Sequence, residues 1–412
     1  MTPAFVFNCQ PNGLGIIHAL GRQGVKVFAL DAYRSIGTYS KYAEYIQVPD
    51  PLVDVNGFID ALMSVQGEIE EKPLLLPTND HWAEAVSMNM EILQKKYTIC
   101  TPPFDVLKMI LDKYAFARFA AELEVLVPQV WSLQEIVGIA DRIKYPVAIK
   151  AKTRRSVGNS IDNRERNGFA DSLRFVKCFN KKELFSNMEY AKRNGVECYC
   201  QQIVNGDSTC MRTVGVYANR GKLKGLFYGR KVRGYPASYG DCIVGEALPI
   251  EPWVRNLAEM LITSLEYTGI AEIEVMEDSV THEKYLIEVN PRSWSWVELC
   301  PHVGVNLAYL AYQDLVLHHD VKYTETDTSK LPIRYVKVIP DLKNVLFKYK
   351  KDGDKKLSMT FLEWVNEIRS IKTIMAEFPE DDIPIMFNSI RFFLKSLICS
   401  RIKGIKWLFL KK

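Results

Sequence analysis

Oxygen-bearing side chains recur at every second position in two short apolar segments of the chain. Glu272 and Glu274 lie within residues 270–276, Glu288 lies near the end of residues 284–289, and Asn290 follows directly. Side chains alternate along a β-strand, so each pair is expected on one face of its strand. If the two strands form a hairpin whose faces coincide, three or four oxygen ligands converge, which suits a hard divalent cation. Taken alone, the pattern is equally typical of a solvated face on an exposed hairpin.

Basic residues that could bind an anion lie on either side of this hairpin in the sequence. Arg292 follows Asn290 and Pro291 and carries a planar donor fork that matches a phosphate or a carboxylate. Lys150 lies near the end of an apolar strand expected over 147–151, where a cation needs an anionic partner or exposure to water. Lys231 and Arg233 would share a face of a further strand, although cations at that density usually mark a solvated surface.

The order of these residues resembles a known family. Glu274 followed by Glu288-x-Asn290-x-Arg292 is similar to the magnesium-binding signature of the ATP-grasp superfamily. Members of that superfamily include biotin carboxylase, carbamoyl-phosphate synthetase, D-alanine–D-alanine ligase and D-aspartate ligase. The family's other motifs have counterparts upstream in the expected order, namely Asp112-Lys113, the strand with Lys150, and the segment 201–207. The resemblance covers residues 1–320 and depends on the order of the motifs rather than on any single one.

The resemblance implies a role for each matching residue. Magnesium would be held by Glu274, Glu288 and Asn290, with two ions expected. The other implied contacts are to ATP and the acyl-phosphate: Lys113 and Lys150 at the phosphates; Gln201, Gln202, Ile203 and Val204 at adenine; Asp207 at the ribose; and Lys231, Arg233 and Arg292 at the γ-phosphate and the substrate carboxylate. Many relatives have Glu where Gln202 stands, which leaves the side-chain contact to adenine open between Gln201 and Gln202. The polar segment 152–168 would form the loop that closes over the phosphates, with fewer glycines and more arginines than the family pattern.

Such an enzyme uses ATP and Mg²⁺ to phosphorylate a carboxylate, and an amine then displaces phosphate from the acyl-phosphate. The resemblance therefore implies an ADP-forming carboxylate–amine ligase. One alternative is a nucleotide-binding relative without catalysis, against which the intact metal-binding signature argues. Another is a nicotinamide-dependent dehydrogenase, suggested by Gly13-x-Gly15 and by Asp31 at the end of the second strand. The third glycine of that fingerprint is missing at the required spacing.

The elements that must position these residues predict a mixed α/β and α+β architecture, an ATP-grasp fold preceded by a Rossmann-like unit. Strands at 4–9, 25–30 and 74–77 alternate with helices, which predicts a parallel sheet with helices on its faces. The predicted domains are a pre-ATP-grasp α/β domain over 1–104, the ATP-grasp domain over 105–325 with a lid subdomain at about 133–204, and a C-terminal extension over 326–412. A helix over 104–123 is expected to open the second domain.

The C-terminal segment has a composition of its own. Residues 391–412 contain seven Lys or Arg and no acid, so without them the net charge of +4 becomes −3. Leu394, Ile398, Ile402 and Ile405 recur at three- and four-residue steps, which is typical of an interfacial amphipathic helix. A terminal helix packed on the body would have the same pattern. The first interpretation predicts peripheral contact with the inner face of a membrane, where a lipid-linked cell-envelope or polysaccharide carboxylate would be the substrate.

Composition also limits the other functional classes. The slightly acidic remainder argues against a nucleic-acid-binding surface. The nine cysteines include no CxxC pair and are expected to be reduced, and the N-terminus lacks the pattern of a signal peptide. The sequence contains no uncharged apolar run of roughly 18 residues. We therefore expect a cytoplasmic protein that acts on small-molecule or lipid-linked carboxylates and amines, with a homodimer as one open assembly state.

Overall fold

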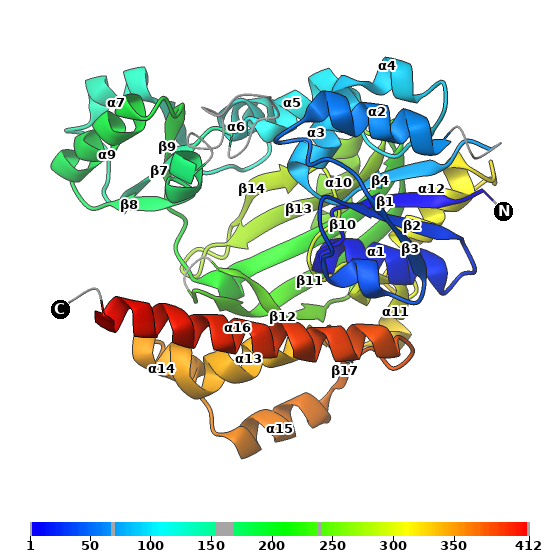
Figure 1. The fold of residues 1–412 in the computed structure, drawn as a ribbon. Coiled ribbons are helices and arrows are strands. Elements are labelled where there is room, and N and C mark those ends of the chain that lie inside the picture. Colours follow the sequence, from blue (N-terminus) through cyan, green and yellow to red (C-terminus); the bar gives the residue numbers. More distant parts are fainter. Residues whose placement is uncertain (1, 67–70, 154–167, 238–239, 410–412) are drawn as a thin grey trace.

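The computed structural model describes residues 2–66, 71–153, 168–237 and 240–409. Its N-terminal part is a five-stranded parallel sheet in the order β3-β2-β1-β4-β5 (Figure 1). The predicted alternation of strands and helices is confirmed. The strands are β1 (Ala4–Phe7), β2 (Val27–Asp31), β3 (Ala43–Gln47), β4 (Leu74–Pro77) and β5 (Thr98–Ile99), and the helical segments are α1 (Pro11–Gly21), η1 (Ile36–Tyr39), α2 (Val55–Gln66), α3 (Asp80–Met88) and α4 (Met90–Leu93).

A large and mostly antiparallel sheet forms the centre of the molecule, in the order β14-β13-β10-β11-β12-β16-β17, with β15 beside β11. Its strands are β10 (Met211–Asn219), β11 (Lys222–Tyr235), β12 (Asp241–Ala247), β13 (Gly269–Glu277), β14 (Lys284–Asn290), β15 (Thr324–Glu325), β16 (Ile333–Val336) and β17 (Lys372–Met375). The helices α5 (Phe104–Leu111), α6 (Lys113–Glu122) and α10 (Pro252–Ser264) bury one face. On the other face, α1 and the helices α11 (Leu299–His302) and α12 (Leu307–Leu315) complete a second apolar core.

The helix expected over 104–123 is interrupted at Asp112, so that prediction was wrong in detail. The Asp112 carboxylate accepts hydrogen bonds from the backbone N–H groups of Tyr114 and Ala115, both at 3.0 Å. These bonds cap the N-terminus of α6, and Asp112 itself has an extended backbone. The cap makes Lys113 the first residue of α6 and directs the start of that helix toward β14.

A smaller antiparallel sheet lies to one side of the central sheet and has its own apolar core (Figure 1). Its order is β6-β9-β7-β8, formed by β6 (Val130–Ser132), β7 (Val147–Ala151), β8 (Val176–Cys178) and β9 (Cys198–Gln202). The helices α7 (Leu133–Ile139) and α9 (Lys181–Arg193) cover it. This unit occupies the interval predicted for the lid subdomain, whose limits stay a prediction. Most of the predicted phosphate-covering loop, residues 154–167, lies outside the described residues.

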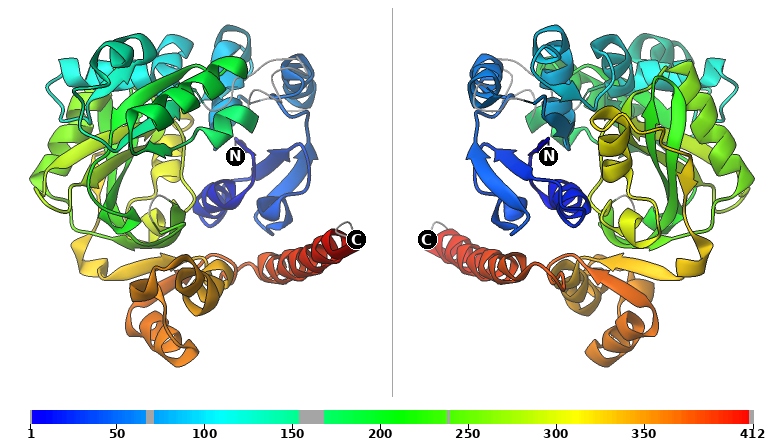
Figure 2. Two further views of the ribbon diagram at one scale, coloured as in Figure 1. Left: turned by 90° about the vertical axis from the view of Figure 1, so that its left-hand side faces the viewer. Right: turned by 90° about the vertical axis from the view of Figure 1, so that its right-hand side faces the viewer.

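The C-terminal part continues the central sheet rather than forming a separate layer. Strand β16 pairs antiparallel with β12, and β17 pairs parallel with β16. The short η3 (Thr328–Lys330) precedes β16, and the long α16 (Ile383–Phe409) follows β17. Between β16 and β17 lie α13 (Val338–Lys343), η4 (Asn344–Lys348), α14 (Tyr349–Asp352), η5 (Lys355–Leu357) and α15 (Phe361–Ser370). In Figure 2, α16 stands apart from α13–α15 and runs beneath the N-terminal unit. Among the helices of the described residues, none combines the length and apolarity needed to cross a bilayer.

A buried ionic cluster fixes the start of α16 to the N-terminal unit. His18 on α1 lies 2.7 Å from Glu298 and 3.1 Å from Asp382, and the Arg22 guanidinium donates to Asp381 at 2.8 Å. Burial opposes protonation of His18, but the Glu298 and Asp382 carboxylates outweigh it and raise the pKa of the ring. The His18 ring, held between two carboxylates, therefore links the beginning of α16 to the body.

Candidate functional site

The four oxygen-bearing side chains of the predicted hairpin lie together on one face of β13 and β14. Glu272 pairs directly with Asn290, and Glu274 pairs directly with Glu288. The Asn290 amide donates to Glu272 at 3.1 Å and to Glu274 at 3.4 Å. The predicted hairpin and the coincidence of its two faces are therefore confirmed.

The carboxylates of this face lie close together, and each lies near a different cation. Burial and the neighbouring Glu274 raise the pKa of Glu272 to about 8. Glu288 is ion-paired with Lys113, and Glu274 lies 3.5 Å from the Lys231 ammonium. In the described part of the chain, no three His, Cys, Asp or Glu side chains form a group that could hold a metal ion.

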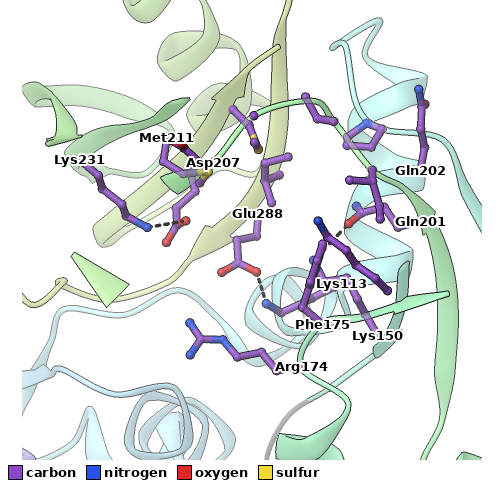
Figure 3. Close-up of a pocket in the computed structure, with 18 residues that line it drawn as sticks. Lys113, Lys150, Arg174, Phe175, Gln201, Gln202, Asp207, Met211, Lys231 and Glu288 are labelled. Atoms are coloured by element: carbon purple, nitrogen blue, oxygen red, sulfur yellow. Dashed lines mark hydrogen bonds and ion pairs between the residues drawn. The ribbon is translucent and has the colours of Figure 1, made fainter. Parts of the chain in front are cut away.

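A pocket of about 130 Å³ opens between the small sheet and the central sheet (Figure 3). Segments far apart in the sequence contribute to it, including β7, the end of β9, β11, β13 and β14. Nearly all residues expected to bind the nucleotide line it, together with two of the carboxylates: Lys113, Lys150, Gln201, Gln202, Ile203, Val204, Asp207, Lys231, Glu274 and Glu288. Arg174, Phe175, Met211, Met276 and Ile287 also line the pocket and were not singled out from the sequence. The lining of the pocket therefore combines cations and carboxylates with apolar side chains.

Lys150 is the most deeply buried cation of this pocket, with 7% of its surface exposed. It lies near the end of β7, and its ammonium donates to Gln201 at 3.2 Å. Burial and the nearby Lys113 lower the pKa of Lys150 to about 8. None of the ion pairs within the described residues involves Lys150. An anion bound in the pocket would satisfy this charge.

Two other predicted nucleotide contacts already have partners in the protein. The Gln202 side chain accepts from the backbone N–H of Gln129 at 3.2 Å, whereas Gln201 faces Lys150. The Asp207 carboxylate accepts from the backbone of Thr209 at 2.9 Å and from Lys356 at 2.8 Å. Both residues still line the pocket.

Arg233 is not at the pocket, contrary to the expectation that it shares the position of Lys231. The pairing of β11 with β12 shifts register between Lys231 and Arg233, so the two residues no longer hold equivalent places. The Arg233 guanidinium instead binds Asp341 at 2.7 and 2.8 Å and Glu367 at 2.7 Å. Arg233 is therefore a buried link to the C-terminal segment rather than a residue of the pocket.

A second cavity of about 230 Å³ lies on the other side of the oxygen cluster. It shares Arg174, Lys231, Glu274 and Glu288 with the first pocket. Its remaining lining comes from the N-terminal unit, the hairpin and the segments that follow it: Asn12, Asn79, Asp241, Cys242, Glu272, Asn290, Arg292, Trp294, Ser295, Trp296 and Lys337. Glu274 and Glu288 therefore line both cavities, whereas Glu272 and Asn290 line the second.

Arg292 lies at this second cavity, beside the oxygen cluster. Its guanidinium donates to Asp80 at 2.8 Å and to the side chain of Asn290 at 3.2 Å, and it lies 3.9 Å from Glu272. Asp80 is the first residue of α3, so the N-terminal unit orients Arg292. The sequence pattern predicted Arg292 but gave no sign of Asp80, which lies more than 200 residues earlier.

The same architecture occurs in solved enzyme structures. A scan against protein-family models and a search of curated protein sequences give no match. The L-amino acid ligase of Bacillus licheniformis is 15% identical with a TM-score of 0.56, over 76% of this chain and 74% of that one. The biotin carboxylase domain of the Hydrogenobacter thermophilus 2-oxoglutarate carboxylase, solved with MgADP, ADP and bicarbonate, is 16% identical with a TM-score of 0.57, over 81% and 73%. Campylobacter jejuni biotin carboxylase is 15% identical with a TM-score of 0.56, over 76% and 70%. This chain therefore has the ATP-grasp fold.

Proposed function

We propose that this protein is an ATP- and Mg²⁺-dependent ligase. It activates a carboxylate as an acyl-phosphate for attack by an amine and releases ADP and phosphate. The observation that carries the proposal is that Glu274 and Glu288 line both cavities. The first cavity contains the Lys150 ammonium, which no ion pair of the described residues neutralises, and the second contains Asn290 and Arg292. The donor set fits the metal, because two carboxylates and an amide oxygen leave places for phosphate oxygens and water.

The reaction requires charge neutralisation and orientation rather than a protein nucleophile. Mg²⁺, when bound, would neutralise charge on the transferring phosphoryl group. Lys113 and Lys231 are held by the carboxylates of Glu288 and Glu274. Both ammonium groups line the first pocket and would bind phosphate oxygens. Arg292 is oriented by Asp80 toward the second cavity and would bind the carboxylate that becomes the acyl-phosphate.

The structural neighbours support ATP as the nucleotide, whereas the amine that accepts the acyl group is our own inference. The Hydrogenobacter domain was solved in complex with MgADP and bicarbonate, and the Bacillus protein is an L-amino acid ligase. We infer an amine acceptor by analogy with the L-amino acid ligase. A small-molecule or lipid-linked carboxylate would occupy the second cavity. The Hydrogenobacter domain was solved as a dimer, and a homodimer of this chain stays a prediction.

The alternative of a nicotinamide-dependent dehydrogenase loses its main support. A Cβ atom on Gly15 would come within 2.9 Å of Val297 and 3.1 Å of the Glu298 backbone. A Cβ atom on Gly13 would meet the Asn8 carbonyl at 2.7 Å. Packing of α1 against its neighbours therefore accounts for both glycines without a dinucleotide. The alternative of a relative without catalysis leaves the matched oxygen ligands without a purpose.

The proposal is tested by ADP release from ATP and Mg²⁺ in a screen of amino acids and other carboxylates, with thermal shifts by MgATP and NADH measured alongside. We expect stabilisation by MgATP but not by NADH, and ADP release that depends on both a carboxylate and an amine. Binding of MgATP without any substrate-dependent turnover would favour the non-catalytic alternative. Stabilisation by NADH alone would favour the dehydrogenase.

Replacing Lys150 by alanine is expected to weaken MgATP binding by about 10-fold or more, because a charge-assisted hydrogen bond to phosphate is lost. Stability should fall little, since among the described residues the ammonium has a hydrogen bond to Gln201 and no ion pair. Calorimetric titration with MgATP beside a melting curve measures both effects. Lys192→Ala, an exposed lysine on α9 of the same unit, is the matched control. Equal nucleotide affinity in wild type and Lys150→Ala would make Lys150 an ordinary strand-end residue.

We also propose that α16 holds the protein at an anionic membrane surface. On the part of α16 whose side chains are described, Ile383, Phe387, Ile390 and Leu394 expose between 39% and 63% of their surface and follow one another at four-, three- and four-residue steps. The sequence continues the apolar stripe and adds seven cations without an acid. A substrate attached to lipid would then reach the cavities from the membrane. The protein would be cytoplasmic and peripheral.

A further inference from the structure

The cations around the second cavity are unequally neutralised. Arg292 pairs with Asp80, Lys231 lies 3.5 Å from Glu274, and Arg174 lies 3.1 Å from Asp241. Lys337 lines the same cavity, and no ion pair of the described residues includes it. Its ammonium donates a hydrogen bond of 3.2 Å to the Ser295 hydroxyl.

The fold holds Lys337 at this wall from two sides. It follows β16 directly, and its backbone N–H donates to the carbonyl of Ile243 on β12 at 3.0 Å. Ser295 lies in the turn after β14, one residue beyond Trp294. The positive charge of Lys337 acts to lower the pKa of the Asp241 and Glu377 carboxyl groups, although it forms no ion pair with either. The ammonium therefore has hydrogen-bonding capacity left, since it has three donors.

A second unsatisfied donor lines the cavity. The Trp294 side chain is 2% exposed, and its indole N–H has no hydrogen-bond partner among the described residues. A buried donor without an acceptor is costly. Among the residues that line this cavity, Lys337 thus has an ammonium with donor capacity left, and the Trp294 indole N–H has no acceptor within the described chain.

We propose that Lys337, with Ser295, binds a second anionic group of the substrate, so that the substrate is a carboxylate carrying an additional negative charge. This inference rests on the proposed function, in which Arg292 serves the carboxylate that is phosphorylated. Lys337 then serves the non-reacting end of the same molecule. It makes the C-terminal segment, through β16, a determinant of substrate choice.

The test compares dicarboxylates with monocarboxylates of equal carbon number. Succinate and glutarate, and butyrate and valerate as their partners, are titrated by calorimetry into the full-length protein saturated with MgADP. In the wild type, the better dicarboxylate should bind at least about 10-fold more tightly than its monocarboxylate partner, because one charged contact is added. In Lys337→Met, which keeps the length of the side chain, that preference should disappear while the monocarboxylate affinity is retained.

Controls separate this inference from the function on which it rests. Lys343→Met changes an exposed lysine six positions later and should leave every affinity unchanged. Lys337→Arg should retain part of the preference. A wild type that binds MgADP but does not prefer either dicarboxylate, or a Lys337→Met variant that keeps the preference, overturns the role of Lys337. A wild type that fails to bind MgADP contradicts the proposed function instead.

Discussion

Replacing Glu288 by glutamine should lower substrate-dependent ADP release by roughly 100-fold or more, with the fold intact. The change removes a negative ligand while keeping the size and shape of the side chain, so the cation is held less tightly and the charge of the transferring phosphoryl group is less compensated. Glu288 is central to the site because it faces Glu274 across the hairpin and lines both cavities. Turnover is measured as ADP release over a range of Mg²⁺ concentrations.

Glu288 also pairs with Lys113, so the loss of that ion pair must be separated from the loss of the metal. If the metal is responsible, the variant should need more Mg²⁺, and excess Mg²⁺ should recover part of the activity. If only the ion pair matters, the melting temperature without nucleotide should fall and the Mg²⁺ dependence should not change. Glu283→Gln, an exposed residue before β14 on the same hairpin, is the matched control and should behave like the wild type. Near-normal turnover by Glu288→Gln at saturating ATP and Mg²⁺ would refute the assignment.

The parts of the site that sequence reasoning predicted are those set by local rules. The alternation of side chains places Glu272 with Glu274 and Glu288 with Asn290, whatever surrounds the hairpin. Alternation alone does not set the register between the two strands. The structure pairs Glu272 with Asn290 and Glu274 with Glu288, so the two faces coincide. The position of Lys150 near the end of a buried strand was likewise readable, because an apolar run that includes one lysine limits where the cation can lie.

The parts that sequence reasoning missed depend on long-range pairing. Arg233 was grouped with Lys231 because strict alternation puts residues two apart on one face. The register shift beside β12 breaks that alternation, and Asp341, which binds Arg233, lies 108 residues later. Lys337 had no motif of its own, and only the pairing of β16 with β12 brings it to the cavity. The break at Asp112 is different, because an aspartate ahead of a helical segment is a recognisable N-cap that the apolar pattern of 104–123 obscured.

Ending the chain at Asn388 should abolish binding to anionic vesicles while leaving the folded body and its ATP-dependent activity intact. Each cation near an anionic surface contributes about 1 kcal/mol, and apolar side chains that enter the interface add to this. Residues 391–412 contain seven such cations and no acid. The truncated chain keeps Asp381 and Asp382, which bind Arg22 and His18, and the fully buried Ile385. The anchor of α16 is therefore retained while the basic part is lost.

The measurement is sedimentation with vesicles of phosphatidylcholine alone and of phosphatidylcholine with phosphatidylglycerol, at low and at high salt. The full-length protein should sediment only with the anionic vesicles, and more weakly at high salt, because screening reduces the attraction. Glutamine at the basic positions of 391–406, with the apolar residues unchanged, should lose most of the binding if charge is the main contribution. A full-length protein that ignores anionic vesicles at low salt contradicts the membrane proposal.

A truncated chain that unfolds would have a different meaning. The ring centroids of Phe392 and of Tyr39 on η1 lie 5.9 Å apart, so α16 already packs in part against the N-terminal unit. Phe392→Ala removes that contact while leaving the basic residues in place. A similar fall in melting temperature for Phe392→Ala and for truncation, with no vesicle binding by the wild type, would identify α16 as a packing element. Vesicle binding that survives Phe392→Ala and disappears on truncation would assign the membrane contact to the basic end of the helix.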